Sequence, residues 1–273
     1  MIDTHAHLNF PQLKNQIDKI IAESKKTGVL AIVLAASNLA DSIANLKLAQ
    51  KYPECLFASV GIHPQKTDPE NKMPIDEQLQ SLEKIILDAK RYPLNPIVAI
   101  GETGLDFSEP PPGEEKRTLK DQESLFLGHI KLAQKYNLPL IVHARKAIDE
   151  VIKILSSRAQ RGVFHCYAGG RKRIAKILSL SKDWYFGFDG NLTYDVGLQT
   201  IIPLIPEDKL LIETDSPFLA PAPYRGKVNT PANLHFIQEK INEISQKDLT
   251  KQILHNTKSL FSRLIKASSR LNS

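Results

Sequence analysis

The stretch Ile97-Val98-Ala99-Ile100-Gly101-Glu102 is an apolar run that ends in a carboxylate. A short apolar run of this kind is typical of a buried strand. A charged side chain at the end of such a strand costs free energy unless another charged group needs it there. Four further apolar runs lead in the same way to His5 and His7, to His143, to His165 and to Asp215. Five such endings in one chain predict a common site that is built from strand ends.

The apolar runs alternate with amphipathic stretches along the whole chain, and this alternation predicts βα units and a parallel sheet. Strands are expected at residues 1–5, 29–35, 56–61, 96–101, 139–143, 162–166, 184–188 and 209–214. Helices are expected at residues 12–27, 39–52, 75–91, 117–137, 146–158, 170–180, 195–202 and 231–245, with one more at 248–268.

Eight such units in 273 residues predict an α/β fold: a single (β/α)8 TIM barrel with an extra C-terminal helix, and one domain over residues 1–273. In that barrel the catalytic groups come from the C-terminal ends of different strands. A doubly wound open sheet is the alternative. It would spread the strand ends along a line, so the five endings could not all meet. The pattern of endings therefore favours the closed barrel.

The composition is that of a soluble globular protein, with 42% hydrophobic and 24% charged residues. No apolar run approaches the roughly 18–20 residues that span a bilayer, and the first residues lack the basic and apolar regions of a secretory signal. We therefore expect a cytoplasmic protein with no membrane association and no obligate protein partner. The net charge of +6 suits nucleic acid, but much of the excess lies in residues 247–270, where a solvated helix face also explains it.

The two cysteines, Cys55 and Cys166, do not resemble a disulfide framework. Cys55 opens an apolar run, and we expect a buried thiol there. Cys166 follows His165 directly. Because neighbouring residues of a strand point to opposite faces, we expect Cys166 to point away from a metal that His165 would bind.

The types of residue at the strand ends predict metal binding. His5 and His7 lie two residues apart, on the same face of an extended strand, which suits two ligands of one metal ion. Glu102 is a carboxylate that could bridge two cations, and the glycines beside it allow close approach of the backbone. His143 and His165 would give a second ion its nitrogen ligands. The competing interpretation is a set of hydrogen-bonded core histidines and a salt-bridged or helix-capping glutamate.

Asp215 and Glu213 share the same face of the last predicted strand, so the sequence alone does not choose between them as ligands. Two metal ions about 3.5–4 Å apart can hold a hydroxide, polarise the electrophilic centre and stabilise the leaving oxygen. Asp215 would then bind one ion and accept the proton of the attacking water. Such a centre hydrolyses phosphodiesters, phosphotriesters, esters, lactones or amides.

Three further residues are candidates for substrate binding. His63 ends the third predicted strand, Arg145 follows His143 by two residues, and Arg225 lies in the loop after the last strand, close to Lys227. Cationic side chains near a two-metal centre suit phosphate oxygens. Ordinary surface charge is the alternative for each.

These segments resemble the TatD family of metal-dependent hydrolases, which are amidohydrolase-like barrels. The resemblance runs from Asp3 to Phe261, nearly the whole chain. Its most specific segments are residues 3–7 (Asp-Thr-His-Ala-His), 61–64 (Gly-Ile-His-Pro), 99–106 (Ala-Ile-Gly-Glu-Thr-Gly-Leu-Asp), 165–169 (His-Cys-Tyr-Ala-Gly) and 211–221 (Leu-Ile-Glu-Thr-Asp-Ser-Pro-Phe-Leu-Ala-Pro), followed by 225–227 (Arg-Gly-Lys).

The resemblance implies that His5, His7 and Asp215 hold one metal ion, and that Glu102 bridges to a second ion held by His143 and His165. It also favours Asp215 over Glu213. Members of the family are commonly divalent-metal-dependent deoxyribonucleases, often 3′→5′ exonucleases, so the resemblance implies a DNA substrate. Departures from the usual family pattern occur where substrate would enter, at Ala144, Tyr167-Ala168, Thr230 and the segment 109–115.

Three hypotheses follow. The first is a hydrolase with two divalent metal ions (Mg, Mn or Zn) that cleaves DNA as a 3′→5′ exonuclease. The second keeps the barrel and the metals but acts on ester or amide substrates such as D-aminoacyl-tRNA. The third is a barrel that keeps its ligands for stability and serves as an interaction module. Four histidines favour zinc, manganese or another transition ion over magnesium on ligand softness, whereas family members are often assayed with magnesium.

Overall fold

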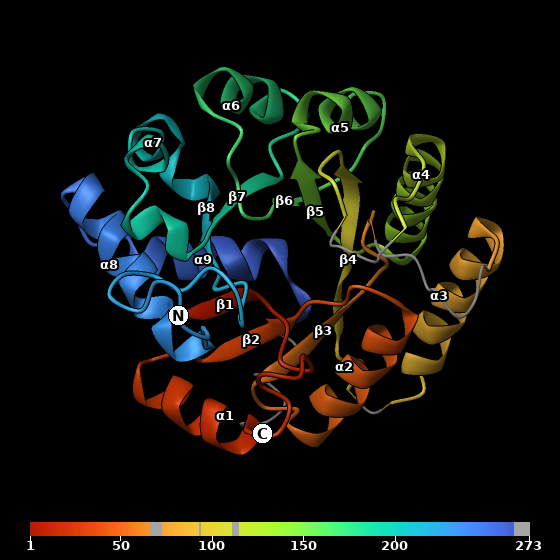
Figure 1. The fold of residues 1–273 in the computed structure, drawn as a ribbon, viewed down its shortest axis with the longest axis horizontal. Helices are drawn as coiled ribbons and strands as arrows, with labels where there is room; N and C mark the ends of the chain where they lie inside the picture. Colours follow the sequence, from red (N-terminus) through yellow and green to blue (C-terminus); the bar gives the residue numbers. More distant parts are fainter. Residues whose placement is uncertain (66–72, 93, 111–114, 265–273) are drawn as a thin grey trace.

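A computed structural model describes residues 1–65, 73–92, 94–110 and 115–264. One eight-stranded parallel sheet forms its centre, and the strands follow one another in space in their order along the chain (Figure 1). They are β1 (Ile2–Ala6), β2 (Ala31–Leu34), β3 (Leu56–Val60), β4 (Ile97–Asp106), β5 (Leu140–Arg145), β6 (Gly162–Phe164), β7 (Trp184–Phe188) and β8 (Leu210–Ile212).

The sheet curls until its first strand meets the segment after its last. Ala6 forms a parallel bridge with Ser216, and the backbone N–H of His7 donates to the carbonyl of Ser216 at 2.7 Å. The barrel is thereby nearly closed. The predicted TIM barrel is confirmed, and the open, doubly wound sheet is wrong for this chain.

Helices surround the strands on the outside of the barrel (Figure 1). They are α1 (Ile17–Lys26), α2 (Leu39–Lys51), α3 (Ile75–Ala89), α4 (Leu119–Tyr136), α5 (Ile148–Leu155), α6 (Arg171–Leu178), α7 (Val196–Gln199), α8 (Leu234–Ser245) and the extra helix α9 (Thr250–Leu260). Among the residues that the structure describes, no helix is both long and apolar enough to cross a bilayer.

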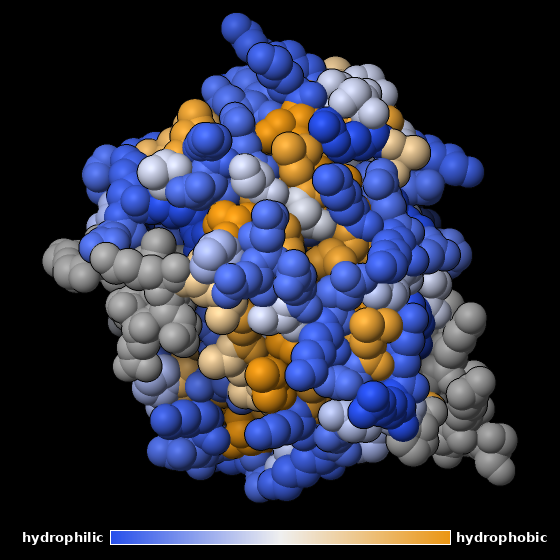
Figure 2. Space-filling view, turned by 90° about the vertical axis from the view of Figure 1, so that its right-hand side faces the viewer, coloured by the Kyte–Doolittle hydropathy of each residue, from blue (hydrophilic) through white to orange (hydrophobic). Residues whose placement is uncertain are grey.

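Local sequence explains how these helices begin and which face they bury. The hydroxyl of Thr118 accepts a hydrogen bond from the N–H of Asp121 and so caps α4. In α5 the buried residues are Val151, Ile152 and, about one helical turn later, Leu155, and together they form one apolar face of the helix. Figure 2 shows the flank near α3 and α4, where hydrophilic side chains surround several apolar groups.

One end of the barrel is filled with apolar side chains. Residues from several strands, among them Val33, Val98 and Leu211, pack into one cluster with Phe261 and Leu264 from the C-terminal segment. Phe261 is completely buried. Because this plug lies at the N-terminal ends of the strands, the ligand-type residues are left at the opposite end, which is the barrel's mouth.

Some predicted boundaries were wrong. Strand β4 continues to Asp106 instead of ending at residue 101, because its backbone pairs with β5 as far as Asp106 opposite Arg145. Glu102 therefore lies inside a strand. Strand β6 ends at Phe164 and β8 at Ile212, both earlier than predicted.

The helix predicted at residues 12–27 begins only at Ile17, because Leu13 and Lys14 donate to the carbonyl of Phe10 and form a turn. The helix predicted at 195–202 is reduced to α7, with 3-10 turns at Gly190–Thr193 and Ile202–Leu204. Proline at position 203 lacks the N–H that would continue the helix. The end of the helix predicted at 248–268 lies outside the described residues from position 265 onward.

Candidate metal centre

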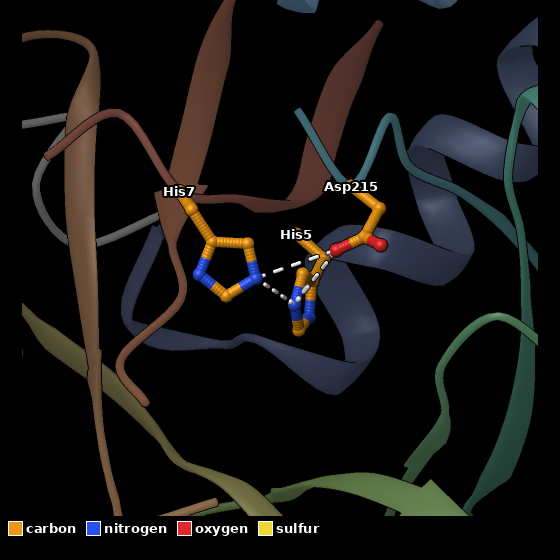
Figure 3. Close-up of side chains that lie close together, drawn as sticks. All are labelled: His5, His7 and Asp215. Atoms are coloured by element: carbon orange, nitrogen blue, oxygen red, sulfur yellow. Dashed lines mark hydrogen bonds and ion pairs between the residues drawn. The ribbon is translucent and has the colours of Figure 1, made fainter. Parts of the chain in front are cut away.

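The end of β1 and the segment after β8 bring three ligand-type side chains to one point (Figure 3). His5 Nε2 lies 3.1 Å from His7 Nε2. Asp215 Oδ1 lies 3.4 Å from His5 Nε2 and 3.3 Å from His7 Nε2. His5 is fully buried, whereas the Asp215 side chain is 14% exposed. The carboxylate therefore remains accessible to solvent or substrate.

Hydrogen bonds across the β1/β8 seam position this triplet. The backbone N–H of Asp215 donates to the carbonyl of His5 at 2.9 Å. Behind it, the carboxylate of Asp3 accepts from the backbone N–H of His5 at 3.2 Å and of Thr214 at 3.0 Å. Burial raises the pKa of Asp3 to about 7, against the effect of these hydrogen bonds. The seam that closes the barrel thus also orients the side chains of the triplet.

Glu102 faces two groups of histidines with its two carboxylate oxygens. Its Oε2 lies 3.7 Å from His5 Nε2 and 3.9 Å from His7 Nε2. Its Oε1 lies 2.8 Å from both His143 Nδ1 and His165 Nε2. This division is what a carboxylate needs in order to bridge two cations.

The second group consists of His143 and His165, whose Nδ1 and Nε2 atoms lie 3.1 Å apart. Burial lowers the pKa of His165, but the Glu102 carboxylate outweighs burial, and the pKa rises to about 9. Burial by itself would raise the pKa of Glu102. The surrounding imidazoles, led by His165, outweigh burial and hold that pKa well below its usual range. Because a metal ion at this point would displace a proton, we expect metal binding to release protons.

The separations between donor atoms fit divalent metal ions. An ion about 2.1 Å from each donor places tetrahedral ligands about 3.4 Å apart and adjacent octahedral ligands about 3.0 Å apart. In the first group the donor atoms of His5, His7 and Asp215 lie 3.1, 3.3 and 3.4 Å apart. In the second group the donor atoms of His143, His165 and Glu102 lie 2.8 or 3.1 Å apart. The two groups could therefore each hold an ion.

Close backbone packing makes room for these side chains. Gly104 pairs with His143 in the sheet, and a Cβ atom there would overlap the carbonyl oxygen of His143. Its φ of 132° is also one that side chains of L-residues rarely adopt. The expectation that the glycines beside Glu102 permit close approach is confirmed at this position.

Asp106 is a functional candidate that the sequence interpretation missed. Its Oδ2 lies 3.0 Å from His143 Nε2, while its Oδ1 accepts from both the N–H and the hydroxyl of Ser108. A proton on Nε2 of His143 leaves Nδ1 free for a metal ion, and a carboxylate in this position fixes both the tautomer and the orientation of the ring. The sequence held a partial signal: Asp106 and Glu102 lie four residues apart, which puts them on the same face if the strand continues to Asp106.

Glu213, the alternative to Asp215, lies behind the centre. It is fully buried and accepts hydrogen bonds from the N–H of Cys166 at 2.5 Å and from the hydroxyl of Thr4 at 3.2 Å. A Cβ atom at Gly187 would come within 2.7 Å of its Oε2, so glycine leaves room for the carboxylate. Burial raises the pKa of Glu213 to about 8. Its nearest histidine nitrogen, Nδ1 of His165, is 3.8 Å away.

The prediction that Cys166 points away from His165 is wrong. Cys166 follows the end of β6 and has a φ of 45°, so strand alternation does not apply to it. Cys166 lines the cavity at the mouth of the barrel, and its sulfur lies within 4.8 Å of the ligand atoms of His165 and Asp215. Burial raises the pKa of this thiol well above its usual range. Cys55 is buried, as predicted.

The centre opens into a cavity of about 1120 Å³ at the mouth of the barrel. His63 and Arg145, two of the predicted substrate-binding residues, line this cavity. Nδ1 of His63 accepts from the N–H of Gln65 at 3.1 Å, so a neutral His63 carries its proton on Nε2. That atom lies 3.7 Å from Glu102 Oε1. His63 thus directs a donor toward the centre.

Arg225, the third predicted substrate-binding residue, is not among the residues that line the cavity. It is exposed, and its guanidinium lies 4.2 Å from the centre of the Tyr194 ring. The hydroxyl of Tyr194 in turn donates to Asn191, which does line the cavity. Arg225 is therefore close to the rim and not inside.

The chain is similar to metal-dependent hydrolases over nearly its whole length. The family model described as TatD related DNase matches residues 2–262. The chain is 30% identical over 269 residues to the uncharacterized metal-dependent hydrolase YabD of Bacillus subtilis, covering 96% of this chain and 98% of that one. It is also 30% identical over 268 residues to the 3′-5′ ssDNA/RNA exonuclease TatD of Edwardsiella piscicida, covering 94% and 96%.

Among solved structures, YJJV, a TatD homologue from Escherichia coli K12, superposes with a TM-score of 0.82 at 26% identity, covering 96% of this chain and 98% of that chain. The barrel, the clustered histidines and carboxylates, and a family match over nearly the whole length lead to one conclusion. The chain belongs to the TatD family of metal-dependent hydrolases.

Proposed function

We propose that this protein is a deoxyribonuclease that removes nucleotides from the 3′ end of DNA, using two divalent metal ions. His5, His7 and Asp215 would hold one ion, His143 and His165 the other, and Glu102 would bridge them. The observation that supports this most is the division of the Glu102 carboxylate, whose Oε2 faces His5 and His7 while its Oε1 faces the other two histidines.

The ions, when bound, would lower the pKa of the attacking water and neutralise charge on the phosphate. Asp215 is placed to accept the proton of that water, because its carboxylate is partly exposed beside His5 and His7. The Nε2–H of His63 would donate to a phosphate oxygen. Arg145 would hold a neighbouring phosphate as an exposed cation on the cavity wall, and Arg225 would contact the strand outside the cavity.

The nucleic acid substrate is supported by the net charge of +6 and by the named activity of the Edwardsiella relative. The test is cleavage of 3′- and 5′-labelled single-stranded DNA by protein loaded with Mg, Mn or Zn, with Asp215→Asn as the paired control. We expect a ladder that shortens from the 3′ end and is absent with EDTA and with the variant. A variant that retains the wild-type rate would contradict the role of Asp215. Without cleavage under any metal, ester or amide substrates such as D-aminoacyl-tRNA become the better hypothesis.

A further inference from the structure

One wall of the cavity at the mouth carries two aromatic rings. Phe10, from the turn after β1, and Phe218, from the loop after β8, form an edge-to-face pair with ring centres 5.6 Å apart. The ring of His7 lies 4.8 Å from Phe10 and 6.3 Å from Phe218. Both phenylalanines line the cavity together with Asp215. We call Phe10 and Phe218 the aromatic shelf.

The shelf is not explained by packing alone. Phe218 is 44% exposed, although burying a phenylalanine side chain stabilises a protein by about 1.5–3 kcal/mol. The exposed ring lies beside a centre of buried charged groups, so a ligand bound at the centre is close enough to cover the ring. Such a ligand would combine an apolar, planar part with a group that the centre binds.

A different wall carries cations. Arg145 and Lys146 both line the cavity and are exposed. Neither has an ion pair within the described ranges of the chain. By contrast Arg173, which also lines the cavity, is paired with Asp149 at 2.6 Å. The two unpaired cations suit the phosphates of a nucleic acid strand.

The topology of the barrel separates these two walls. The shelf comes from the loops after β1 and β8, which are neighbours at the seam, whereas Arg145 and Lys146 lie at the end of β5, which pairs with β4. In a ring of eight strands the β4/β5 pair lies opposite the β8/β1 seam. The ligand-type residues of both groups lie between the two walls.

We propose that the aromatic shelf is a base-stacking subsite, which takes the nucleobase of a nucleotide next to the bond that is cleaved. This inference rests on the proposed nuclease function and adds to it how the substrate is oriented. The base lies on the shelf, its phosphate lies at the centre, and the strand continues past Arg145 and Lys146. A nucleotide meets all the requirements, since every base has a flat apolar face and stacks on aromatic rings irrespective of sequence.

The first experiment measures kcat/KM on single-stranded DNA that is intact or carries an abasic residue at the terminal or the penultimate 3′ position. Phe218→Ala should lower kcat/KM on intact DNA by roughly 5- to 150-fold, the range that base–aromatic stacking provides. The wild type should lose a similar factor at one of the two abasic positions, which identifies the base that stacks. Phe218→Ala should lose nothing further at that position.

Phe218→Trp should restore the rate on intact DNA, since a larger ring still stacks. The matched control is Tyr224→Ala. Tyr224 lies in the same loop and is 39% exposed, but its ring packs on Phe236 and does not line the cavity. We expect Tyr224→Ala to leave both substrates unaffected. If Phe218→Ala matches the wild type on intact DNA, or if its loss multiplies with that of the abasic residue, the subsite is refuted.

A binding experiment separates the subsite from the nuclease function. Single-stranded DNA with 2-aminopurine at the 3′ end or next to it is titrated into Asp215→Asn protein, and its fluorescence is measured. A fluorescence change at one position that disappears in Asp215→Asn/Phe218→Ala supports the subsite, even if the wild type cleaves no DNA. A fluorescence change that does not depend on Phe218 refutes it, even if DNA is cleaved. A Phe218 effect confined to ester hydrolysis would also refute it and assign the shelf to an acyl side chain.

Discussion

Replacing Asp106 by asparagine should weaken metal binding without changing the shape of the site. In the wild type, Oδ2 of Asp106 faces His143 Nε2 at 3.0 Å, and its Oδ1 accepts from both the N–H and the hydroxyl of Ser108. Asparagine offers only one oxygen. If that oxygen faces the His143 N–H, the amide NH2 meets the Ser108 N–H, and two donors oppose each other. If the oxygen faces Ser108, the donors oppose each other at His143.

The size of the effect follows from these contacts. The charge-assisted hydrogen bond to the imidazole is lost, and either orientation leaves a mismatched pair. Loss of a carboxylate that orients a metal-binding histidine typically costs 10- to 100-fold in metal affinity, which is about 1.4–2.7 kcal/mol. The ion that depends on His143 should be affected, whereas the ion at His5, His7 and Asp215 should keep its affinity.

Competition between the protein and a fluorescent chelator, for zinc or manganese, measures both dissociation constants. Asp149→Asn is the matched control, because Asp149 lines the same cavity but pairs with Arg173 and Lys176 and not with a histidine. It should bind both ions as the wild type does. Two unchanged dissociation constants in Asp106→Asn would show that the His143 ring does not need this carboxylate, and our reasoning would then be wrong.

Burial lowers the pKa of His129 to about 4, whereas the pKa of a histidine in the unfolded chain is about 6.5. The unfolded state therefore binds the proton first, and about 3 kcal/mol of stability should be lost as the pH falls from 6.5 to 4. The variant His129→Gln keeps an acceptor for the N–H of Ile62, and its unfolding free energy, measured by urea unfolding, should fall less over this pH range. An equal fall in the wild type and the variant would exclude His129 as the cause. Arg145→Ala should raise KM for single-stranded DNA and lower the slope of log KM against log salt by about 0.7, and an unchanged slope would exclude a phosphate contact. Phe261→Ala should cost about 3–5 kcal/mol in unfolding free energy with unchanged metal affinities, because the plug lies at the other end of the barrel; altered affinities would contradict this separation.

The barrel was predictable because each buried strand is a short apolar run and each helix between them is amphipathic. The errors occur where tertiary partners decide. The polar residues from Glu102 to Asp106 do not look like a strand, yet β5 supplies their backbone partners and their side chains face the centre. The segment 195–202 resembles a helix, but Pro203 and the adjacent 3-10 turns leave only α7 of it.

The candidate site was predictable as a set of strand ends, because His5, His7 and Asp215 do converge. Their role as metal ligands remains a prediction. The contact of Asp106 with His143, 37 residues apart, depends on how β4 and β5 pair and could not be read from spacing. Phe10 gave no sequence signal, because a lone phenylalanine beside a predicted helix is ordinarily a core residue.

The β1/β8 seam also determines when a metal ion can be held during synthesis of the chain. Asp3 and Thr214, which are 211 residues apart, meet there, as do His5 and Asp215. A nascent chain that has not yet reached Asp215 cannot complete the first group of donors. An ion that binds only the complete barrel stabilises the barrel by mass action, by about 4 kcal/mol when the free ion concentration is a thousand times its Kd. The concentration of metal ions around the protein would then control both its catalytic rate and how long it survives proteolysis.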